Sequence, residues 1–541
     1  MAATFDFPVL GGRWLGRATG RSGSSLTPSR NVAASLFPPL IAGSLALVAV
    51  LQGWRGVDFS AQLYRVGLFH QQGLTLWDSQ WYGGHWTLNY SVIFPPVAGI
   101  IGVEATEVLS AFVAAWAFDR LVVGHFGKSA RVGSLIFAVG TMVQAAIGQL
   151  PFLLGEALAL AAIWAATRRR WRLAGVLAVA TALASPLAGS FLVLAAVAWL
   201  VASWPRRRLA LAALVAAAAI PVLVLSLAFP GQGAMPFTVG DFGWLLALFV
   251  AALLLIPREE RTLRIGAALY VAAIVLSFVV PSSMGINISR LGECVGAPLA
   301  ACVLWQHRRL LVPAAVVPLA LLQWGPSATS FTSRSDPSTQ PGYFQPLVGY
   351  LAQHAQPAGR VEIVPTARHW EAAYVAPYYP LARGWERQLD TADNALFYDR
   401  GQLDANSYRA WLLDNGVRYV ALADVPLDYA ATQEGRLVRA GVPGLVPVWH
   451  DHHWRVFQVT GSSGIVDGPA QLVRMDGGSI NLQTSGPGVV LLRVRYSSRW
   501  SVAEGNGCLY GTPSGWTTLV ANQAAAFHLA LQQIAASQSS C

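Results

Sequence analysis

Two carboxylates in an aromatic-rich segment are the first candidates for chemistry. Asp58 and Asp78 lie in the stretch 54–96, which reads WRGVDFSAQLYRVGLFHQQGLTLWDSQWYGGHWTLNYSVIFPP. A carboxylate partly shielded from water can act as a general base that takes the proton of a sugar hydroxyl. Tryptophan and tyrosine at this density suit stacking on sugar rings, and equally the headgroup region of a membrane. The stretch therefore predicts a site for a sugar at a membrane surface.

The same residues also have structural interpretations. Residues 58–71 have helical spacing, which predicts a helix lying flat on the membrane, and Asp58 can cap its first turn. Asp78 fits a turn equally well. His85 and Tyr90 are further candidates for substrate binding, or members of an interfacial aromatic belt.

A second candidate group lies in PSSMGINISRLGE, residues 281–293. An unpaired arginine at membrane depth costs several kcal/mol, so Arg290 needs a partner. Its guanidinium suits the phosphate of a lipid, and Asn287 nearby is a candidate for the same substrate. The alternative is a structural pair with Glu293 at helical spacing. Gln149, at the end of an apolar run, is a candidate to line a cavity beside the first segment.

The elements that must position these residues are predicted to be membrane helices. Of the 541 residues, 54% are hydrophobic and 12% are charged, whereas soluble proteins carry roughly 25% charged residues. Apolar runs long enough for a bilayer predict about eleven helical spans. These spans are 36–53, 92–118, 132–149, 151–167, 173–187, 188–204, 209–229, 242–257, 264–281, 291–306 and 310–324.

The net charge of +10 reflects topology, and no nucleic-acid partner is expected. Arginines gather in short groups between apolar runs, such as 168–172, 206–208 and 258–264. These groups fall at every second turn, which is typical of cytoplasmic loops and predicts a cytoplasmic N-terminus. The heavy use of Ala and Arg fits a bacterial chain, whose location would be the plasma (inner) membrane.

The predicted domains follow from this alternation. Residues 1–35 are predicted to be a disordered cytoplasmic tail, and 36–324 the membrane domain, with 54–91 as its long first outer loop. Residues 325–342 are predicted to be a linker, and 343–541 an extracytoplasmic domain. Strands and helices alternate up to about 440, and only strands follow from about 454, which predicts an α/β layer and then a β-sandwich-like unit.

Three features of the last domain stay open. Cys508 and Cys541 can form a disulfide in an oxidising compartment. The run 450–453, His-Asp-His-His, reads as a polar turn in preference to a metal site, because adjacent residues of an extended segment face opposite ways. Residues 383–387 form either a grip for an acidic glycan or a solvated surface turn.

The chain resembles the GT-C superfamily of glycosyltransferases that use polyprenyl-phosphate sugars. The resemblance rests on an Asp just beyond the first span, an amphipathic first outer loop, many spans and a C-terminal outer domain. The run VDFSAQLYRVGLFHQQGLTLWDSQWYGGHWTLNYSVIFPP is similar to uncharacterised bacterial membrane proteins of that clan, some labelled "6-pyruvoyl-tetrahydropterin synthase-related". The resemblance implies a GT-C-like fold and a catalytic base at Asp58. A second acidic motif of some members is not obvious, so metal use stays undetermined.

The expected function is transfer of a sugar from a polyprenyl-phosphate donor to an extracytoplasmic cell-envelope glycan or lipid. Asp58 would be the base, and Arg290, Asn287, Asp78, His85, Tyr90 and Gln149 would bind substrate. The expected partners are the bilayer, the lipid-linked sugar and the acceptor glycan. No residues are singled out as ligands of a metal ion. One alternative is a transporter or flippase of lipid-linked intermediates, and another is a non-catalytic envelope-assembly scaffold.

The predicted topology can be tested with reporter fusions. Fusions at Arg207 and at Gly401 should report opposite sides of the membrane, because the arginine groups place the first inside and the second outside. Reporter activity that depends on the compartment, such as that of a phosphatase, measures this directly. Two fusions that report the same side would contradict the topology.

Overall fold

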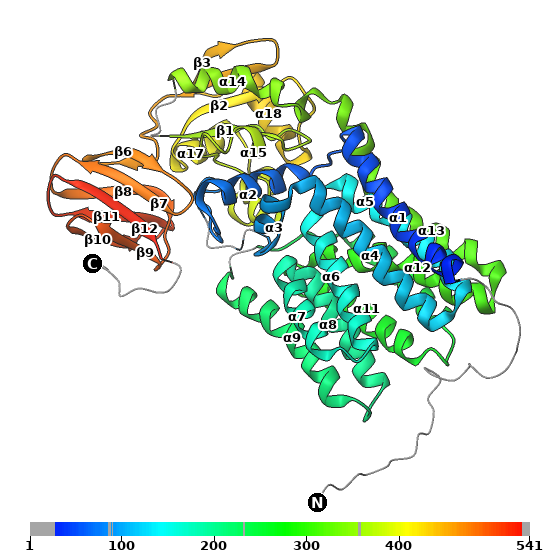
Figure 1. Cartoon of the computed structure of the whole chain (residues 1–541). Coiled ribbons are helices and arrows are strands. Elements are labelled where there is room, and N and C mark those ends of the chain that lie inside the picture. Colours follow the sequence, from blue (N-terminus) through cyan, green and yellow to red (C-terminus); the bar gives the residue numbers. More distant parts are fainter. Residues whose placement is uncertain (1–27, 85–87, 89, 231–232, 355–358, 533–540) are drawn as a thin grey trace, which may run out of the picture.

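The computed structural model describes residues 28–84, 88, 90–230, 233–354, 359–532 and 541. The chain is mostly helical, with a helical bundle followed by a C-terminal part rich in β-sheet (Figure 1). The predicted tail falls largely outside the described residues, and α1 begins at Pro28, ahead of the predicted start at 36. The predicted order of a helical region and then a sheet region is therefore confirmed.

Among the described residues, the bundle contains eight helices that are long and apolar enough to cross a membrane. Three shorter apolar helices accompany them, at 171–184, 186–202 and 239–255. The count of about eleven spans stays a prediction. The bundle helices are α1 (Pro28–Gln52), α4 (Val103–Phe126), α5 (Arg131–Ile147), α6 (Leu150–Thr167), α7 (Trp171–Ala184), α8 (Pro186–Ala202), α9 (Arg208–Ala228), α10 (Val239–Leu255), α11 (Arg261–Val279), α12 (Ser289–His307) and α13 (Val312–Trp324).

One predicted span has different bounds. The run 92–118 is divided into α3 (Phe94–Ile101) and α4 (Val103–Phe126). Gly102 separates them with φ 96°, in the left-handed region that glycine adopts without strain. Glu104 and Glu107 follow directly after this break, where the apolar run is at its most polar. The long helix therefore begins at Val103.

The segment 54–91, which is predicted to be the first outer loop, forms a helix, α2 (Phe59–Gln72), that packs into the protein. Buried residues include Phe59, Ala61, Tyr64 and Val66, and also the polar Arg65. Figure 1 shows α2 between the bundle and the C-terminal part. Protein therefore covers most of α2, and its contact with a membrane surface stays a prediction.

The first C-terminal unit is an α/β layer. Its sheet has the order β1-β2-β4-β3, in which β1 and β2 are parallel and the other pairs antiparallel. The predicted alternation of strands and helices up to about 440, and the strand that begins at 454, are confirmed. Its elements are α14 (Pro341–His354), β1 (Arg360–Ile363), α15 (Glu371–Tyr374), α16 (Arg387–Asp393), α17 (Ala405–Asp414), β2 (Val417–Ala423), α18 (Thr432–Ala440), β3 (Leu445–His450) and β4 (Trp454–Val459). Strand β3 was not predicted, since Pro447 and its exposed side chains obscure the strand pattern.

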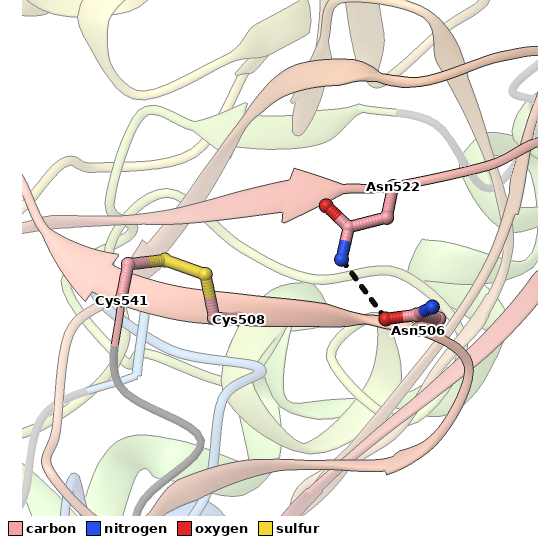
Figure 2. The surroundings of a disulfide bond; sticks show 4 residues. All are labelled: Asn506, Cys508, Asn522 and Cys541. Atoms are coloured by element: carbon pink, nitrogen blue, oxygen red, sulfur yellow. Dashed lines mark hydrogen bonds between the residues drawn. A yellow bond between two sulfur atoms is a disulfide. The ribbon is translucent and has the colours of Figure 1, made fainter.

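The second C-terminal unit consists of two four-stranded antiparallel sheets, β10-β11-β8-β5 and β6-β7-β12-β9. Buried side chains from both sheets, such as Leu492 and Leu482, form one core. Its strands are β5 (Val466–Asp467), β6 (Ala470–Met475), β7 (Ser479–Thr484), β8 (Gly488–Arg495), β9 (Trp500–Glu504), β10 (Gly507–Gly511), β11 (Trp516–Ala521) and β12 (Ala526–Leu531). A disulfide joins Cys508 in β10 to Cys541 (Figure 2).

The segment 325–342 connects the two parts as ordered 3-10 turns. These are η4 (Gly325–Ser327), η5 (Ser330–Ser335) and η6 (Pro337–Thr339). Several of its serines are buried, and the Ser333 hydroxyl accepts a hydrogen bond of 2.9 Å from the Arg55 amide. The connection therefore packs against the start of the first outer loop.

Backbone hydrogen bonds tie the first outer loop to both C-terminal units. The Leu381 amide donates to the Gln80 carbonyl at 2.8 Å, which joins the loop to the α/β unit. The Arg495 amide donates to the Gly83 carbonyl at 2.8 Å, which joins the loop to β8. Because backbone groups make these bonds, the loop has a fixed path between the two units.

Gly148 tests how tightly α5 packs against the start of α2. A Cβ added at Gly148 would clash with the backbone nitrogen of Phe59. The φ of Gly148 is 90°. We expect Gly148→Ala to lower the apparent melting temperature clearly in detergent. Gly127→Ala is the matched control, because Gly127 also has a positive φ, 79°, but open space around it. Equal losses in both variants would show that backbone conformation alone matters.

Candidate functional site

Asp58 lies directly before α2 and faces the bundle. Its backbone amide donates to the carbonyl of Ile147, at the end of α5, at 3.1 Å. Its side chain makes no capping hydrogen bond, and its backbone is helical, with φ −79° and ψ −15°, whereas cap residues are usually extended. Its carboxylate instead lies 3.8 Å from the guanidinium of Arg290. The capping interpretation is therefore wrong, and Asp58 takes part in a contact between two distant segments.

Arg290 stands in the first turn of α12. One of its amino groups donates to the Tyr90 hydroxyl at 2.9 Å, and its guanidinium lies 5.8 Å from the centre of the Phe152 ring. Within the described ranges no ion pair joins it to Glu293, whose carboxylate accepts a hydrogen bond of 2.6 Å from Ser289. The prediction of a local Arg290–Glu293 pair is wrong, because the first outer loop supplies both partners.

A second arginine, Arg65 of α2, completes the polar contacts from the loop side. It is buried, forms an ion pair of 3.3 Å with Glu386, and its guanidinium lies 5.5 Å from the Tyr90 ring centre. Tyr82 reinforces this junction, since its hydroxyl accepts a hydrogen bond of 3.0 Å from the Glu386 amide. Tyr90 thus lies between the two arginines, Arg65 and Arg290.

The charges around Asp58 act against one another. Burial raises the pKa of its carboxyl above the ordinary value. Positive charges lower the pKa in turn, those of Arg290, Arg65 and His369. Its side chain is 29% exposed, so the carboxylate keeps access to solvent. A carboxylate with a raised pKa and solvent access has the properties that a general base needs.

The other predicted site residues do not all meet here. Gln149 follows Gly148, which packs against Phe59, so it lies at the same edge of the bundle. Asn287 lies in the turn before α12 and donates to the Ser283 carbonyl at 3.3 Å. His85 lies outside the described residues. The structure therefore brings together Asp58, Arg290 and Tyr90, with Gln149 and Asn287 at the margin.

Asp78 lies in a turn away from this group. Its carboxylate accepts hydrogen bonds from the Tyr64 hydroxyl at 2.6 Å and the Gln80 amide at 3.0 Å. The second bond, two residues along the chain, is that of an Asx turn. Burial raises the pKa of Asp78 to about 6. Asp78 therefore stabilises the loop, which agrees with its structural interpretation.

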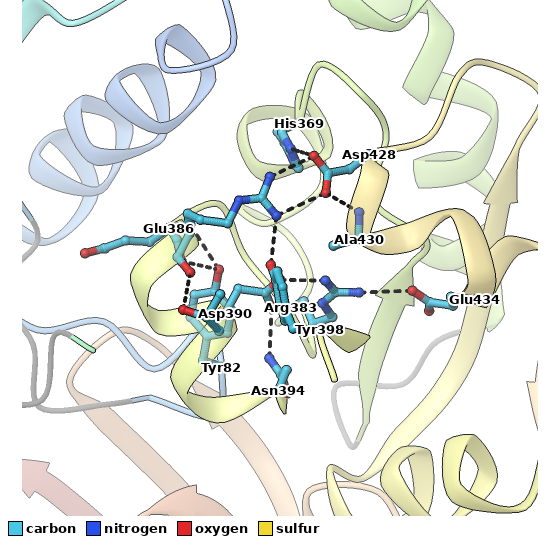
Figure 3. Close-up of polar contacts among 12 residues, drawn as sticks. Tyr82, His369, Arg383, Glu386, Asp390, Asn394, Tyr398, Asp428, Ala430 and Glu434 are labelled. Atoms are coloured by element: carbon cyan, nitrogen blue, oxygen red, sulfur yellow. Dashed lines mark hydrogen bonds and ion pairs between the residues drawn. The ribbon is translucent and has the colours of Figure 1, made fainter. Parts of the chain in front are cut away.

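The residues 383–387 form neither a glycan grip nor a solvated turn. Arg383 is buried and makes ion pairs of 2.5 Å with Asp390 and 3.0 Å with Glu434 (Figure 3). Arg387 makes an ion pair of 2.8 Å with Asp428. The carboxylates come from 390, 428 and 434, which the local sequence does not connect to the arginines. These pairs form a buried network inside the α/β unit.

The run 450–453 is a turn, as predicted. The Asp451 carboxylate accepts hydrogen bonds from the amides of His453 and Trp454, at 2.9 and 2.7 Å. The His453 ring pairs with Asp424 at 3.0 Å. In the part of the chain that the structure describes, no group of three or more His, Cys, Asp or Glu side chains is placed to hold a metal ion.

Arg65, Glu386 and His369 were not predicted as site residues. Arg65 is the one with a sequence signal, since it is a charged residue in the otherwise weakly charged helix 59–72. Glu386 and His369 come from the C-terminal part, far from Asp58 along the chain. Nothing in their local sequence indicates contact with the first outer loop.

The raised pKa of Asp78 predicts a pH dependence of stability. Because its pKa is about 6 in the folded chain and 3.8 in the reference state, the folded form binds more protons between these values. This group's contribution to stability is therefore present below pH 4 and is lost as the pH rises through 6. Between pH 5 and 7, the melting temperature of Asp78→Asn should therefore fall less than that of the wild type. An unchanged pH dependence would show that Asp78 titrates normally.

Comparison with known proteins assigns no family to the chain. No family model matches it, and a search of curated proteins finds no match. The site geometry and the resemblance of the segment 54–96 are therefore the features that bear on function.

Proposed function

We propose that the protein is a membrane glycosyltransferase that moves a sugar from a polyprenyl phosphate to an envelope glycan or lipid. The observation that carries this proposal is the meeting of Asp58, Arg290 and Tyr90 at the junction of the bundle and the C-terminal part. A carboxylate and a guanidinium at one point match the two needs of the reaction, a base and a holder for phosphate. The GT-C-like resemblance supports the same assignment.

The proposed reaction has one step at the anomeric carbon. Asp58 takes the proton of the acceptor hydroxyl, whose oxygen then attacks the anomeric carbon from the face opposite the phosphate. The bond between that carbon and the phosphate oxygen breaks, and the configuration inverts. The polyprenyl phosphate leaves with its negative charge, which Arg290 stabilises by hydrogen bonds. Tyr90 orients the guanidinium through its hydroxyl.

The ion pair of Asp58 and Arg290 fits this reaction. At 3.8 Å the two groups are paired without a short hydrogen bond, so a phosphate can replace Asp58 as the partner of Arg290. That exchange frees the carboxylate to accept a proton. The Arg290 side chain is 14% exposed, so a headgroup would reach it through a small opening.

We further propose that the C-terminal part is extracytoplasmic and that the N-terminus is cytoplasmic, in a bacterial plasma membrane. The alternating arginine groups support this orientation. The disulfide between Cys508 and Cys541 supports it too, because disulfides persist in oxidising compartments. Lipid-linked sugars and glycan acceptors on that side would meet the junction directly.

A transporter of lipid-linked intermediates is the second candidate. Buried acidic residues within the bundle helices favour it, namely Glu107 and Asp119 in α4 and Glu156 in α6. Ionisable groups inside membrane segments often mark transport pathways. Glu156 is hydrogen-bonded by Gln144 at 2.9 Å, however, which gives it a structural role. These buried acidic residues are therefore weaker support for a transporter than the meeting of Asp58, Arg290 and Tyr90 is for a glycosyltransferase.

The experiment compares Asp58→Asn with a deletion strain. Deletion should accumulate a lipid-linked sugar, which mass spectrometry of extracted lipids detects. Because Asn has a similar shape but takes no proton, Asp58→Asn should fold normally and lower turnover by at least about a hundredfold. The lipid-linked sugar should therefore still accumulate when the Asp58→Asn protein is expressed in the deletion strain. If the Asp58→Asn protein abolished the accumulation as fully as the wild type does, Asp58 would have no part in the mechanism.

Three further variants complete this experiment. Asp241→Asn is the matched control, because Asp241 also stands at a helix start but accepts a hydrogen bond from Thr238, away from the junction. Expressed in the deletion strain, this variant should abolish the accumulation of the lipid-linked sugar. Arg290→Lys should impair turnover while Glu293→Gln is tolerated, because only Arg290 meets the phosphate. Loss of function in Glu156→Gln with full function in Asp58→Asn would favour the transporter.

A further inference from the structure

Seven exposed arginines occupy two short turns of the helical bundle. They are Arg168, Arg169, Arg170, Arg172, Arg206, Arg207 and Arg208, and together they are called the arginine patch. The first turn joins α6 to α7, and the second joins α8 to α9. These turns lie at the opposite end of α6 from the candidate site, which adjoins the start of that helix.

The two turns lie side by side. Helices α6 to α9 follow one another through short turns, and α7 packs against both α8 and α9 (Figure 1). The rings of Trp171, just after the first turn, and Trp199, in the last turn of α8, have centres 6.5 Å apart. Ala174 of α7 and Leu214 of α9 belong to one buried core. The arginine patch is therefore one surface of the protein.

The chain supplies no carboxylate to balance this surface. The sequence contains no Asp or Glu between Glu156 and Asp241. Among the described residues, none of the seven arginines forms an ion pair. The arginine group at 258–264 differs, because it contains acidic residues, of which Glu260 lies 2.8 Å from the ring of His125. The positive charge of the arginine patch is thus left for ions or molecules outside the chain to balance.

The backbone of both turns would suit glycine better than arginine. Arg169 has φ 60°, in the left-handed region that glycine adopts without strain. Its amide donates to the Ala166 carbonyl at 3.0 Å, and the amide of Arg170 donates to the Ala165 carbonyl at 2.9 Å. These two bonds end many helices, and the left-handed residue between them is usually glycine. Arg207, in the second turn, has φ 56°. Both turns therefore place an arginine where local backbone conformation disfavours it.

Exposed apolar side chains border the arginine patch. Trp204 is 62% exposed, and the guanidinium of Arg208 lies over its ring at 5.8 Å from the centre. Leu209 is 80% exposed, and Leu173 is exposed as well. A soluble anion would leave these side chains in water. A lipid instead covers them with its acyl chains and presents its phosphate to the arginines.

We propose that the arginine patch binds the headgroups of anionic phospholipids. The unbalanced positive charge calls for an anionic partner, and the exposed apolar border calls for one that carries acyl chains. A guanidinium holds a phosphate through two parallel hydrogen bonds, which makes arginine suited to this partner. Basic surfaces beside membrane helices attract anionic lipids in the same way. The proposal concerns a surface apart from Asp58 and does not depend on the proposed glycosyl transfer.

The test compares two lipids on the purified full-length protein in a neutral detergent. Phosphatidylglycerol is anionic and phosphatidylcholine is zwitterionic, and both are used with the same acyl chains. Phosphatidylglycerol should raise the apparent melting temperature by at least about 3 °C more than phosphatidylcholine, because a ligand of the folded state stabilises it. Inorganic phosphate at the same concentration should have little effect. Equal effects of the two lipids, or an equal effect of inorganic phosphate, would overturn the proposal.

A double variant locates the effect on the arginine patch. Arg169→Gly with Arg207→Gly removes two charges and suits the left-handed backbone, so this variant should be at least as stable as the wild type without lipid. It should lose about half or more of the stabilisation by phosphatidylglycerol. Arg169→Lys with Arg207→Lys keeps the charge and should retain most of the stabilisation.

The matched control removes two arginines from the group that contains acidic residues. Arg258→Gln with Arg261→Gln lowers the net charge of the protein by the same amount, and it should retain the full stabilisation by phosphatidylglycerol. Equal losses in this control and in Arg169→Gly with Arg207→Gly would show that net charge alone attracts the lipid. That outcome would overturn the proposal.

Discussion

The buried ion pair between Arg65 and Glu386 is the contact on which the candidate site depends. The two side chains are 4% and 11% exposed, so each charge has exchanged water for its partner. Removing one member of such a pair typically costs about 3–5 kcal/mol, because the other charge stays buried alone. This constraint ties α2 to the C-terminal part. It thereby also determines where Asp58, at the start of α2, can lie.

The junction is made from three segments that are distant along the chain. The first outer loop supplies Asp58, Arg65 and Tyr90, α12 supplies Arg290, and the C-terminal part supplies Glu386 and His369. The backbone carbonyls of Gln80 and Gly83 accept hydrogen bonds from Leu381 and Arg495, so the first of these segments is attached to both C-terminal units. A substrate that reaches Asp58 would therefore contact the bundle and the C-terminal part together.

Buried ion pairs hold the α/β unit together. Arg383 is enclosed by Asp390 and Glu434, and this group stabilises the unit without solvent access. Burial raises the pKa of Asp390, but the pairing with Arg383 outweighs it and lowers the pKa below its ordinary value. A second group pairs His369 and Arg387 with Asp428 in the same unit. Both groups join segments of the α/β unit that are distant along the chain.

The sequence alone determined the elements of this protein, because hydropathy and periodicity are local. The helical bundle, the strands at 454–459 and 479–484 and the helix 59–72 all follow from the order of apolar residues. It also indicated Asp58, Arg290 and Tyr90 as residues for one site. Only the tertiary structure decided their partners. The partner of a buried arginine is whichever carboxylate the fold places beside it. That carboxylate can lie hundreds of residues away, as Glu386 does from Arg65, so the neighbouring sequence does not identify it. For this reason the predictions of an Asp58 cap and of an Arg290–Glu293 pair are wrong, and only the folded chain reveals Arg65, Glu386 and His369.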